Sequence, residues 1–359
     1  MKHVEEYRDP EMARKISSRI REINRRAIRI MEVCGTHTMS IFRYGIRSLL
    51  PDTISLISGP GCPVCVTSQR EIDVCIEICR MKDVTVATFG DLMRVPGTDS
   101  SLQKERANGR DVRVVYSTFD AMDLARKNPH RRVVFLGVGF ETTAPTVAAS
   151  ILTARNEGVG NYLVFSAHKL VPPALEALLG TEGVAIDGLI LPGHVSVIIG
   201  EKAYEPLVEK YRTPCAIAGF EPVDILHAIH SLTARIEQGA AGLDNCYPRA
   251  VSFGGNQKAQ DAMNAVFEKR NTQWRGIGII PMSGLGIKEE FSSFDAETFF
   301  SLPLPHPKEP AGCSCGEILT GRKIPPECPL YSKVCTPAAP VGPCMVSSEG
   351  TCAAYFRYS

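Results

Sequence analysis

The sequence lacks the features that would place a chain in a membrane, outside the cell or on a nucleic acid. The N-terminus, residues 1–6, is charged and carries no apolar segment of the kind that secretory signals contain. No apolar run reaches the roughly 18 residues that a membrane-spanning helix needs. The 40 basic and 39 acidic residues leave a net charge of +1, so no charge excess indicates binding to nucleic acid or to a membrane surface. We therefore expect a cytoplasmic protein without a membrane or nucleic-acid partner.

Cysteine is the residue type that stands out against this ordinary composition. Six of the 13 cysteines lie within the last 47 residues, and in a reducing compartment such a cluster indicates metal or redox chemistry rather than a disulfide scaffold. Their spacing matches neither the common ferredoxin patterns nor the paired cysteines typical of zinc modules. A thiolate-only set suits a soft metal, so we predict an iron–sulfur centre. Four cysteines would hold a [4Fe–4S] cluster, which leaves two for a redox disulfide; the six are Cys313, Cys315, Cys328, Cys335, Cys344 and Cys352.

Short apolar runs alternate with helical stretches through the first 300 residues. An amphipathic helix is expected over residues 10–25, and β-branched runs then predict strands at 28–33, 53–57, 84–88, 113–116, 133–136, 162–165, 188–191, 216–218 and 277–280. Apolar strands that alternate with helices are typical of parallel sheets covered on both faces. We therefore predict an α/β protein with two doubly wound, Rossmann-like parallel-sheet units and a small cysteine-rich C-terminal iron–sulfur module.

The expected boundaries follow from changes in composition. A basic turn at residues 128–132 divides a first α/β unit, residues 1–128, from a second one, residues 129–300. The proline-rich stretch at residues 302–310 is typical of a semi-rigid connector, so the third module comprises residues 301–359. This division places Cys34, Cys62 and Cys65 in the first unit and predicts two separate sulfur sites.

Two neighbouring strands end in turns that carry reactive side chains. Cys62-Pro63-Val64-Cys65 precedes a helix expected from about residue 67 to 80, a context that lowers thiol pKa values and suits a reversible disulfide or a two-thiolate iron site. Cys34 ends the other strand with His37 three residues on, so it is a candidate nucleophile or metal ligand. Because ligands bind at the carboxyl ends of strands in open α/β sheets, we expect these thiols to converge. Two structural cysteines in a tight Gly-Pro turn are the alternative for Cys62 and Cys65, and a buried cysteine that ends a strand is the alternative for Cys34.

Other strand ends carry less specific signals. Residues 139–143, Gly-Phe-Glu-Thr-Thr, open a helix whose free amides suit an anion, but they lack the lysine of a phosphate-binding loop. A simple threonine cap is the alternative. His168 and His194 also follow strands, and each is a candidate proton shuttle or ligand, or a hydrogen-bonded structural histidine.

Four stretches of the sequence, taken in order, resemble the HypD family of hydrogenase maturation proteins. They are residues 34–38 (Cys-Gly-Thr-His-Thr), 59–65 (Gly-Pro-Gly-Cys-Pro-Val-Cys), 139–143, and 335–352 with its Cys-Thr-Pro and Gly-Pro-Cys-Met-Val-Ser-Ser-Glu-Gly-Thr-Cys segments. Long motifs in this order are far more specific than a lone Cys-X-X-Cys pair, and the match runs through most of the chain. The resemblance implies a scaffold on which the Fe(CN)2CO unit of [NiFe]-hydrogenases is assembled, together with a HypC-like chaperone and a HypE-like cyanide donor.

The resemblance also implies roles for the N-terminal cysteines. Cys34, with a cysteine of the HypC-like partner, would hold the nascent iron while cyanide and CO fill its open positions. His37 would tune Cys34 through its charge. Cys62 and Cys65 would either ligate iron or supply two electrons as a dithiol.

For the C-terminal cysteines, the family's likeness to ferredoxin:thioredoxin reductase implies a division of labour. The residues assigned to the [4Fe–4S] cluster are Cys313, Cys328, Cys335 and Cys352. Cys315 and Cys344 become the candidate redox disulfide, and the choice between Cys313 and Cys315 stays open. The main alternative function is an iron–sulfur thiol–disulfide oxidoreductase that acts on other protein thiols. A cysteine-dependent hydrolase that uses Cys34 and His37 is a third hypothesis.

Overall fold

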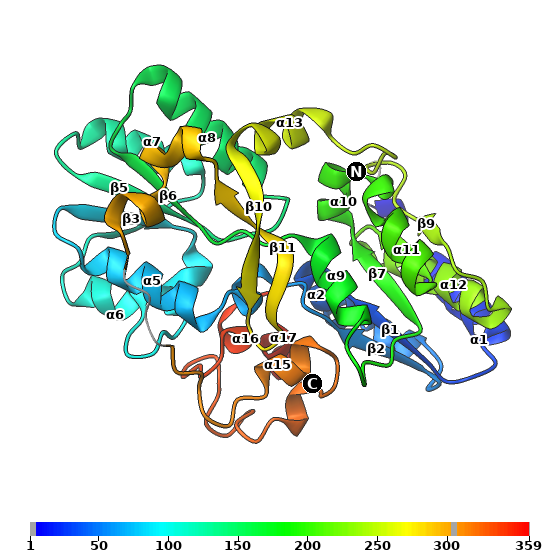
Figure 1. The fold of residues 1–359 in the computed structure, drawn as a ribbon. Coiled ribbons are helices and arrows are strands. Elements are labelled where there is room, and N and C mark those ends of the chain that lie inside the picture. The colour runs from blue at the N-terminus through cyan, green and yellow to red at the C-terminus, as the bar shows by residue number, and fades with distance from the viewer. Residues whose placement is uncertain (1–4, 303–306, 359) are drawn as a thin grey trace.

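The computed structural model describes residues 5–302 and 307–358, in which the apolar runs form two parallel β-sheets (Figure 1). A five-stranded sheet has the order β2-β1-β7-β8-β9, with bounds Ile54–Ser58, Ile28–Glu32, Gly188–Pro192, Cys215–Ala218 and Leu243–Asn245. A four-stranded sheet has the order β4-β3-β5-β6, with bounds Val112–Val114, Val84–Thr88, Arg132–Gly137 and Tyr162–Ser166. All neighbouring strands in both sheets are parallel. The predicted α/β class with parallel sheets is confirmed.

An antiparallel hairpin of β10 (Phe267–Trp274) and β11 (Gly278–Ile287) lies between the two sheets (Figure 1). The strand predicted at residues 277–280 therefore overlaps β11 and belongs to this hairpin rather than to a parallel sheet. Sequence patterns gave no sign of β10, because its six central residues are polar or charged and largely solvent-facing. Single bridges connect the hairpin to Thr67, just after α4, and to Lys169, just after β6, so it is tied to a segment from each sheet.

Helices cover both faces of each parallel sheet. One face of the five-stranded sheet packs against α1 (Pro10–Ile23), α2 (Gly35–Arg43), α3 (Ile46–Leu49) and α12 (Pro222–Gln238). The far face of the four-stranded sheet packs against α7 (Thr118–Lys127) and α8 (Ala144–Glu157). The remaining faces share one continuous apolar core that includes α5 (Gln69–Arg80) and α9 (Val171–Leu179). Both sheets are therefore doubly wound, which is the arrangement that strands with apolar side chains on both faces require.

The remaining helices are shorter than α12 and complete the connections. Their bounds are α4 (Pro63–Val66), α6 (Leu102–Ala107), α10 (Gly193–Ile199), α11 (Glu205–Tyr211), α13 (Gln257–Val266), α14 (Ala296–Phe300), α15 (Cys315–Leu319), α16 (Pro343–Val346) and α17 (Thr351–Tyr358). Short 3₁₀ helices lie at Glu5–Tyr7, Gly90–Arg94, Glu201–Tyr204, Glu289–Phe294 and Pro325–Glu327. Among the described helices, none combines the length and the apolar composition needed to cross a bilayer.

Local capping explains where two of the longer helices begin. The Asp9 carboxylate accepts a hydrogen bond from the Glu11 amide at 2.8 Å, with Pro10 at the first position, so the predicted N-terminal helix starts at Pro10. The Ser68 hydroxyl and the Glu71 carboxylate form a reciprocal capping box at the start of α5. The helix expected from about residue 67 to 80 is therefore confirmed as α5, and the box separates it from the short α4 before it.

The two sheets are not consecutive along the chain. After β1 and β2 the chain builds the whole four-stranded sheet, and it then returns to add β7, β8 and β9 to the first one. The boundary expected at residues 128–129 falls between β4 and β5, which both pair with β3. That division therefore does not separate the sheets, because the order of strands in a sequence does not say which sheet each strand joins. Of the expected connector, residues 303–306 lie outside the described residues.

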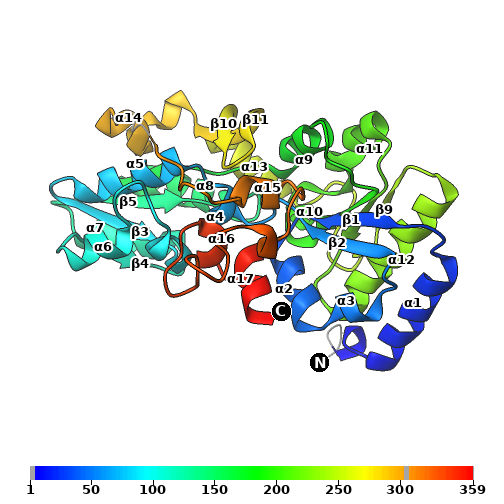
Figure 2. The same cartoon turned by 90° about the horizontal axis from the view of Figure 1, so that it is seen from below.

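The C-terminal segment, residues 307–358, lies across the junction of the two sheets (Figure 2). Within it, α16 packs against α4 and α17 packs against α2. The cysteine-rich segment is therefore in direct contact with the turns that follow β1 and β2.

Candidate metal centre and thiol site

Cys34 lies where the winding of the five-stranded sheet reverses. The chain leaves β1 towards β2 on one side and leaves β7 towards β8 on the other, so the crevice outside the carboxyl ends of β1 and β7 is the expected ligand position. Cys34 follows β1, and His194 follows β7. Both line a cavity of about 440 Å³, which is closed on the other side by Phe140 and Thr142 from the turn after β5. The site predicted at the carboxyl ends of the strands is therefore lined by residues that follow strands of both sheets.

The Cys34 thiol is 9% exposed at the N-cap position of α2. Burial raises its pKa to about 12, and the nearby Glu349 carboxylate acts in the same direction. The amides of His37 and Thr36 oppose these effects, because they stabilise the thiolate. Cys34 is therefore a protonated thiol near neutral pH, and a metal ion that binds it must displace the proton.

Glu349 reaches this site from the C-terminal segment and was not singled out by sequence reasoning. Its carboxylate accepts a 2.6 Å hydrogen bond from the Thr36 hydroxyl, and it lines the same cavity as Cys34. A Cβ on Gly35 would lie only 2.5 Å from the Glu349 Cβ, so glycine is required for this approach. The one available signal was its place in the motif at residues 335–352.

His37 does not act on Cys34 in the way that the sequence suggested. Its Nε2 donates a 2.9 Å hydrogen bond to the Gly219 carbonyl, and its buried Nδ1 has no hydrogen-bond partner among the residues that the structure describes. Burial lowers the His37 pKa to about 4, so the ring is neutral near pH 7 and does not tune the thiol through a positive charge. Phe220 is stacked between His37 and His194, with ring centroids at 4.6 and 3.9 Å. The geometry assigns His37 a packing role beneath the cavity.

Cys62 and Cys65 form a disulfide, with their Cα atoms 5.2 Å apart. Cys62 caps α4, where its sulfur accepts a 3.2 Å hydrogen bond from the Cys65 amide and Pro63 occupies the first position. The turn before it touches the Cys34 turn, because the Gly35 amide donates a 3.1 Å hydrogen bond to the Gly61 carbonyl. The parallel pairing of β1 and β2 thus places both sulfur motifs at one sheet edge, as predicted.

Replacement of Gly61 by alanine is expected to destabilise this junction by about 1–3 kcal/mol, because a Cβ at residue 61 would lie 2.1 Å from the Cys34 amide nitrogen. That contact is with backbone, which cannot move aside as a flexible side chain can. Chemical denaturation measures the loss. The matched control is Gly160→Ala, whose Cβ would meet nothing within 4 Å. Equal stability of the two variants would contradict the close packing.

The six C-terminal cysteines line one enclosed, largely apolar pocket, together with Ile318, Leu330, Tyr331, Gly342 and Met345. In the described part of the chain, no group of three or more potential ligands is already arranged to hold an ion. The chemistry of the lining nevertheless suits an iron–sulfur centre, because such a centre is bound by thiolates and six cysteines line this pocket. Apart from these cysteines, Tyr331 is the one lining residue with a polar side chain. A Cβ on Gly342 would lie 2.9 Å from the Cys313 sulfur, so the absence of a side chain on Gly342 leaves room for this sulfur in the pocket.

Two of these six cysteines are in direct sulfur contact. The Sγ atoms of Cys315 and Cys344, the pair proposed as a redox disulfide, lie 3.0 Å apart as free thiols. Hydrogen bonds with Cys313 and Cys344 lower the Cys315 pKa, and the positive charge of Arg275 acts in the same direction. The division into cluster ligands and a redox pair stays a prediction.

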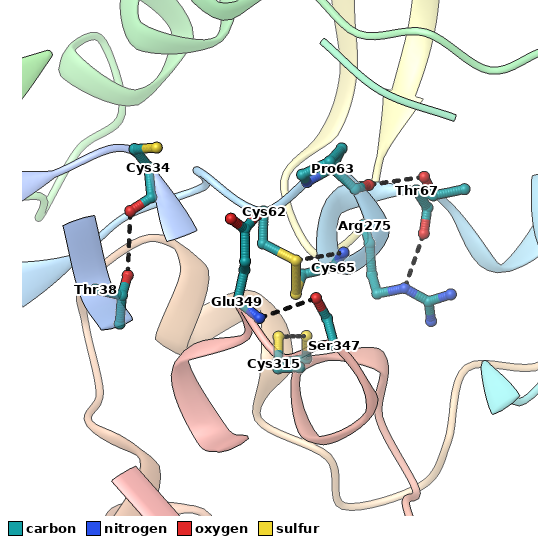
Figure 3. Close-up of a disulfide and its surroundings, with 11 residues drawn as sticks. Cys34, Thr38, Cys62, Pro63, Cys65, Thr67, Arg275, Cys315, Ser347 and Glu349 are labelled. Carbon is teal, nitrogen blue, oxygen red and sulfur yellow. Dashed lines mark hydrogen bonds between the residues drawn. A yellow bond between two sulfur atoms is a disulfide. The ribbon is translucent and has the colours of Figure 1, made fainter. Parts of the chain in front are cut away.

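Arg275 joins the two sulfur sites and was not foreseen from the sequence. Figure 3 shows its side chain between the α4 segment and the C-terminal segment that carries Cys315. Nothing in its surroundings in the sequence marks it, because a single arginine in a hairpin turn reads as a solvated residue. Cys75, Cys79 and Cys215, by contrast, are buried in the apolar core.

The fold and the site together define an α/β protein with two adjoining sulfur sites at the meeting point of its sheets. The chain belongs to the HypD family, since residues 11–359 match the family described as "HypD: Hydrogenase formation hypA family". It is 44% identical over 370 residues to the hydrogenase maturation factor HypD of Rhodobacter capsulatus, with 100% of this chain and 98% of that protein covered. The factors of the same name from Azotobacter vinelandii and Cupriavidus necator are 46% identical over 367 residues and 44% over 371, each covering 100% of this chain and 97% of the relative. The resemblance seen in the motifs is confirmed, and it places the chain in hydrogenase maturation.

Proposed function

We propose that this protein is a cytoplasmic scaffold on which iron acquires cyanide and CO to become the Fe(CN)2CO unit of [NiFe]-hydrogenases. The observation that carries the proposal is the position of Cys34, a free thiol in a cavity of about 440 Å³ with the Cys62–Cys65 disulfide in the adjoining turn. A thiolate is a suitable ligand for low-valent iron that also carries cyanide and CO. A cysteine of a HypC-like chaperone would supply a second thiolate, and a HypE-like protein the cyanide.

The cavity explains how one buried thiol can hold such a substrate. Loss of the Cys34 proton is costly while the site holds no cation, and a bound iron ion offsets that cost with its own charge. The amides of Thr36 and His37 stabilise the thiolate further. Phe140, Val195 and Val197 also line this cavity, and their apolar side chains would keep water away from the diatomic ligands.

In this proposal the Cys62–Cys65 disulfide lies beside the iron and can accept two electrons. Its reduction takes two electrons and two protons and yields the Cys62 and Cys65 thiols, which are ligands only in that form. The C-terminal cysteines would hold a [4Fe–4S] cluster, which supplies electrons one at a time when bound. The contact of α16 with α4 provides the short path that such a transfer needs.

The two alternative functions find less support in the geometry. A thiol–disulfide oxidoreductase that acts on other proteins needs an accessible sulfur, whereas Cys62 and Cys65 are only 4% and 0% exposed. A cysteine hydrolase needs a histidine within hydrogen-bond reach of its nucleophile, whereas the one bonded nitrogen of His37 donates to Gly219.

Infrared spectroscopy on protein purified without oxygen from a host that matures hydrogenases tests the proposal. We expect cyanide and CO stretching bands from the protein with its chaperone, and we expect them to be absent in Cys62→Ser and Cys65→Ser while the brown colour persists. A matched control is Cys79→Ser, a cysteine in α5 that is buried in the core and takes no part in the site. A wild-type complex that carries iron and sulfide but never shows these bands would refute the scaffold role.

A further inference from the structure

Arg275 is a permanently charged side chain held inside the protein. It follows β10 in the turn of the hairpin and is only 2% exposed. A guanidinium stays protonated in proteins, so its charge cannot be removed by burial and must be compensated by neighbours. The question is which group supplies that compensation.

One side of Arg275 is bound to the segment that follows the Cys62–Cys65 disulfide. Its amide donates to the Val66 carbonyl at 2.9 Å and its Nε donates to the Thr67 carbonyl at 3.0 Å. The Nη1 atom donates to Gln69 Oε1 at 2.8 Å. These contacts fix the arginine against α4 and the start of α5.

The carboxylate that pairs with Arg275 is weakly placed for full compensation. Glu309 Oε2 accepts from Nη1 at 3.0 Å, but the Glu309 side chain is 54% exposed, so water screens its charge. The Nη2 atom is buried and makes no hydrogen bond among the described residues. A buried donor without a partner is uncommon in native structures and asks for an explanation.

The other side of Arg275 faces the C-terminal cysteines. A Cβ on Gly276 would lie 2.1 Å from the Gly316 Cα, so the hairpin turn touches the first turn of α15 directly after Cys315. Arg275, Cys313 and Cys315 line one cavity of about 500 Å³. The unpaired donor and the incompletely compensated charge are therefore both next to the thiol pocket.

We propose that Arg275 is a positioning residue that holds the disulfide segment against the C-terminal thiol centre and sets the reduction potential of that centre through its charge and its free Nη2 donor. The proposal rests on the C-terminal cluster of the proposed function. A cluster bound by four thiolates is anionic and gains a further negative charge on reduction, so a buried cation beside it favours the reduced state. Hydrogen bonds to its sulfur atoms act in the same direction.

The test is a reductive titration of the anaerobically purified holoprotein, with the cluster's absorbance and electron paramagnetic resonance signal as readouts. Arg275→Gln is expected to lower the midpoint potential, because the charge is lost. Arg275→Lys keeps the positive charge but loses the planar guanidinium and its several N–H donors. The midpoint potential of this variant should therefore lie between those of Arg275→Gln and the wild type. Glu309→Gln removes the exposed carboxylate and should shift the potential slightly upward.

Arg322→Gln is the matched control, because it removes an exposed positive charge from the same cavity and should leave the potential unchanged. An unchanged potential in a folded Arg275→Gln protein overturns the proposal, while cyanide and CO bands would still support the scaffold. If Arg275→Gln does not fold, the sign of the Glu309→Gln shift decides, and no shift or a downward one overturns it. A wild-type protein without any cluster overturns this proposal together with the cofactor assignment.

Discussion

Replacement of Cys34 by alanine is expected to abolish hydrogenase maturation, with a fall in activity greater than the ~10–100-fold typical when a residue that only hydrogen-bonds a metal ligand is lost. The reason is that Cys34 is the free thiol of the cavity between the sheets, while the sulfurs of Cys62 and Cys65 are joined in a disulfide. The C-terminal iron and sulfide content should stay at the wild-type level, because those thiols line a different pocket. Hydrogenase activity in a strain that carries only the variant measures the effect.

The control for this variant is Cys246→Ala, which removes a half-buried thiol at the far edge of the five-stranded sheet. We expect normal maturation from it. Normal hydrogenase activity with Cys34→Ala would remove the basis of the scaffold proposal. Loss of the C-terminal iron together with activity would show instead that the two sulfur sites depend on each other for folding.

The second large effect is expected from single serine substitutions in the C-terminal pocket. Cys328→Ser and Cys335→Ser should each lose the [4Fe–4S] cluster, because four thiolates are needed to hold it. Cys315→Ser and Cys344→Ser should keep the cluster, since the 3.0 Å contact between these two sulfurs suits a redox pair. They should instead slow the reduction of the Cys62–Cys65 disulfide.

The iron content, the sulfide content and the absorbance of the cluster, measured for each variant, distinguish the two groups of variants. Each serine keeps nearly the same volume as the thiol that it replaces, so the four variants are controls for one another. Loss of the cluster with Cys315→Ser alone would show that Cys313 and Cys315 have exchanged roles. Retention of a full cluster in both Cys328→Ser and Cys335→Ser would contradict the ligand assignment as a whole.

The fold was predictable from local patterns wherever a strand is apolar on both faces. Residues 28–33 and 162–165 gave strands within about one residue of β1 and β6, because the side chains on both faces of these two strands are largely buried. The β10 strand escaped prediction because it is half exposed and charged. The assignment of strands to sheets also escaped it, because pairing between β1 and β7 depends on contacts some 160 residues apart, which no local pattern records.

The candidate site was predictable where its chemistry resides in a motif. Cys34 and the Cys62–Cys65 pair follow adjacent strands, so the rule for strand ends brought them together. The role first given to His37 was wrong in its electrostatics, because sequence spacing does not reveal that the ring is buried against Gly219. Glu349 and Arg275 reach the site from distant segments, and only the folded chain shows it.

The order of the strands along the chain also determines when each part of the site is synthesised. Cys34, Cys62 and Cys65 are made early, whereas the segment that covers their turns begins about 240 residues after Cys65. At a synthesis rate of 5–20 residues per second, that interval is roughly 12–50 s. Until β7 to β9 have been made, which takes up most of this interval, the three thiols lie on an unfinished sheet. The nascent chain is therefore most exposed to premature oxidation and to the wrong metal before its own C-terminus can shield it.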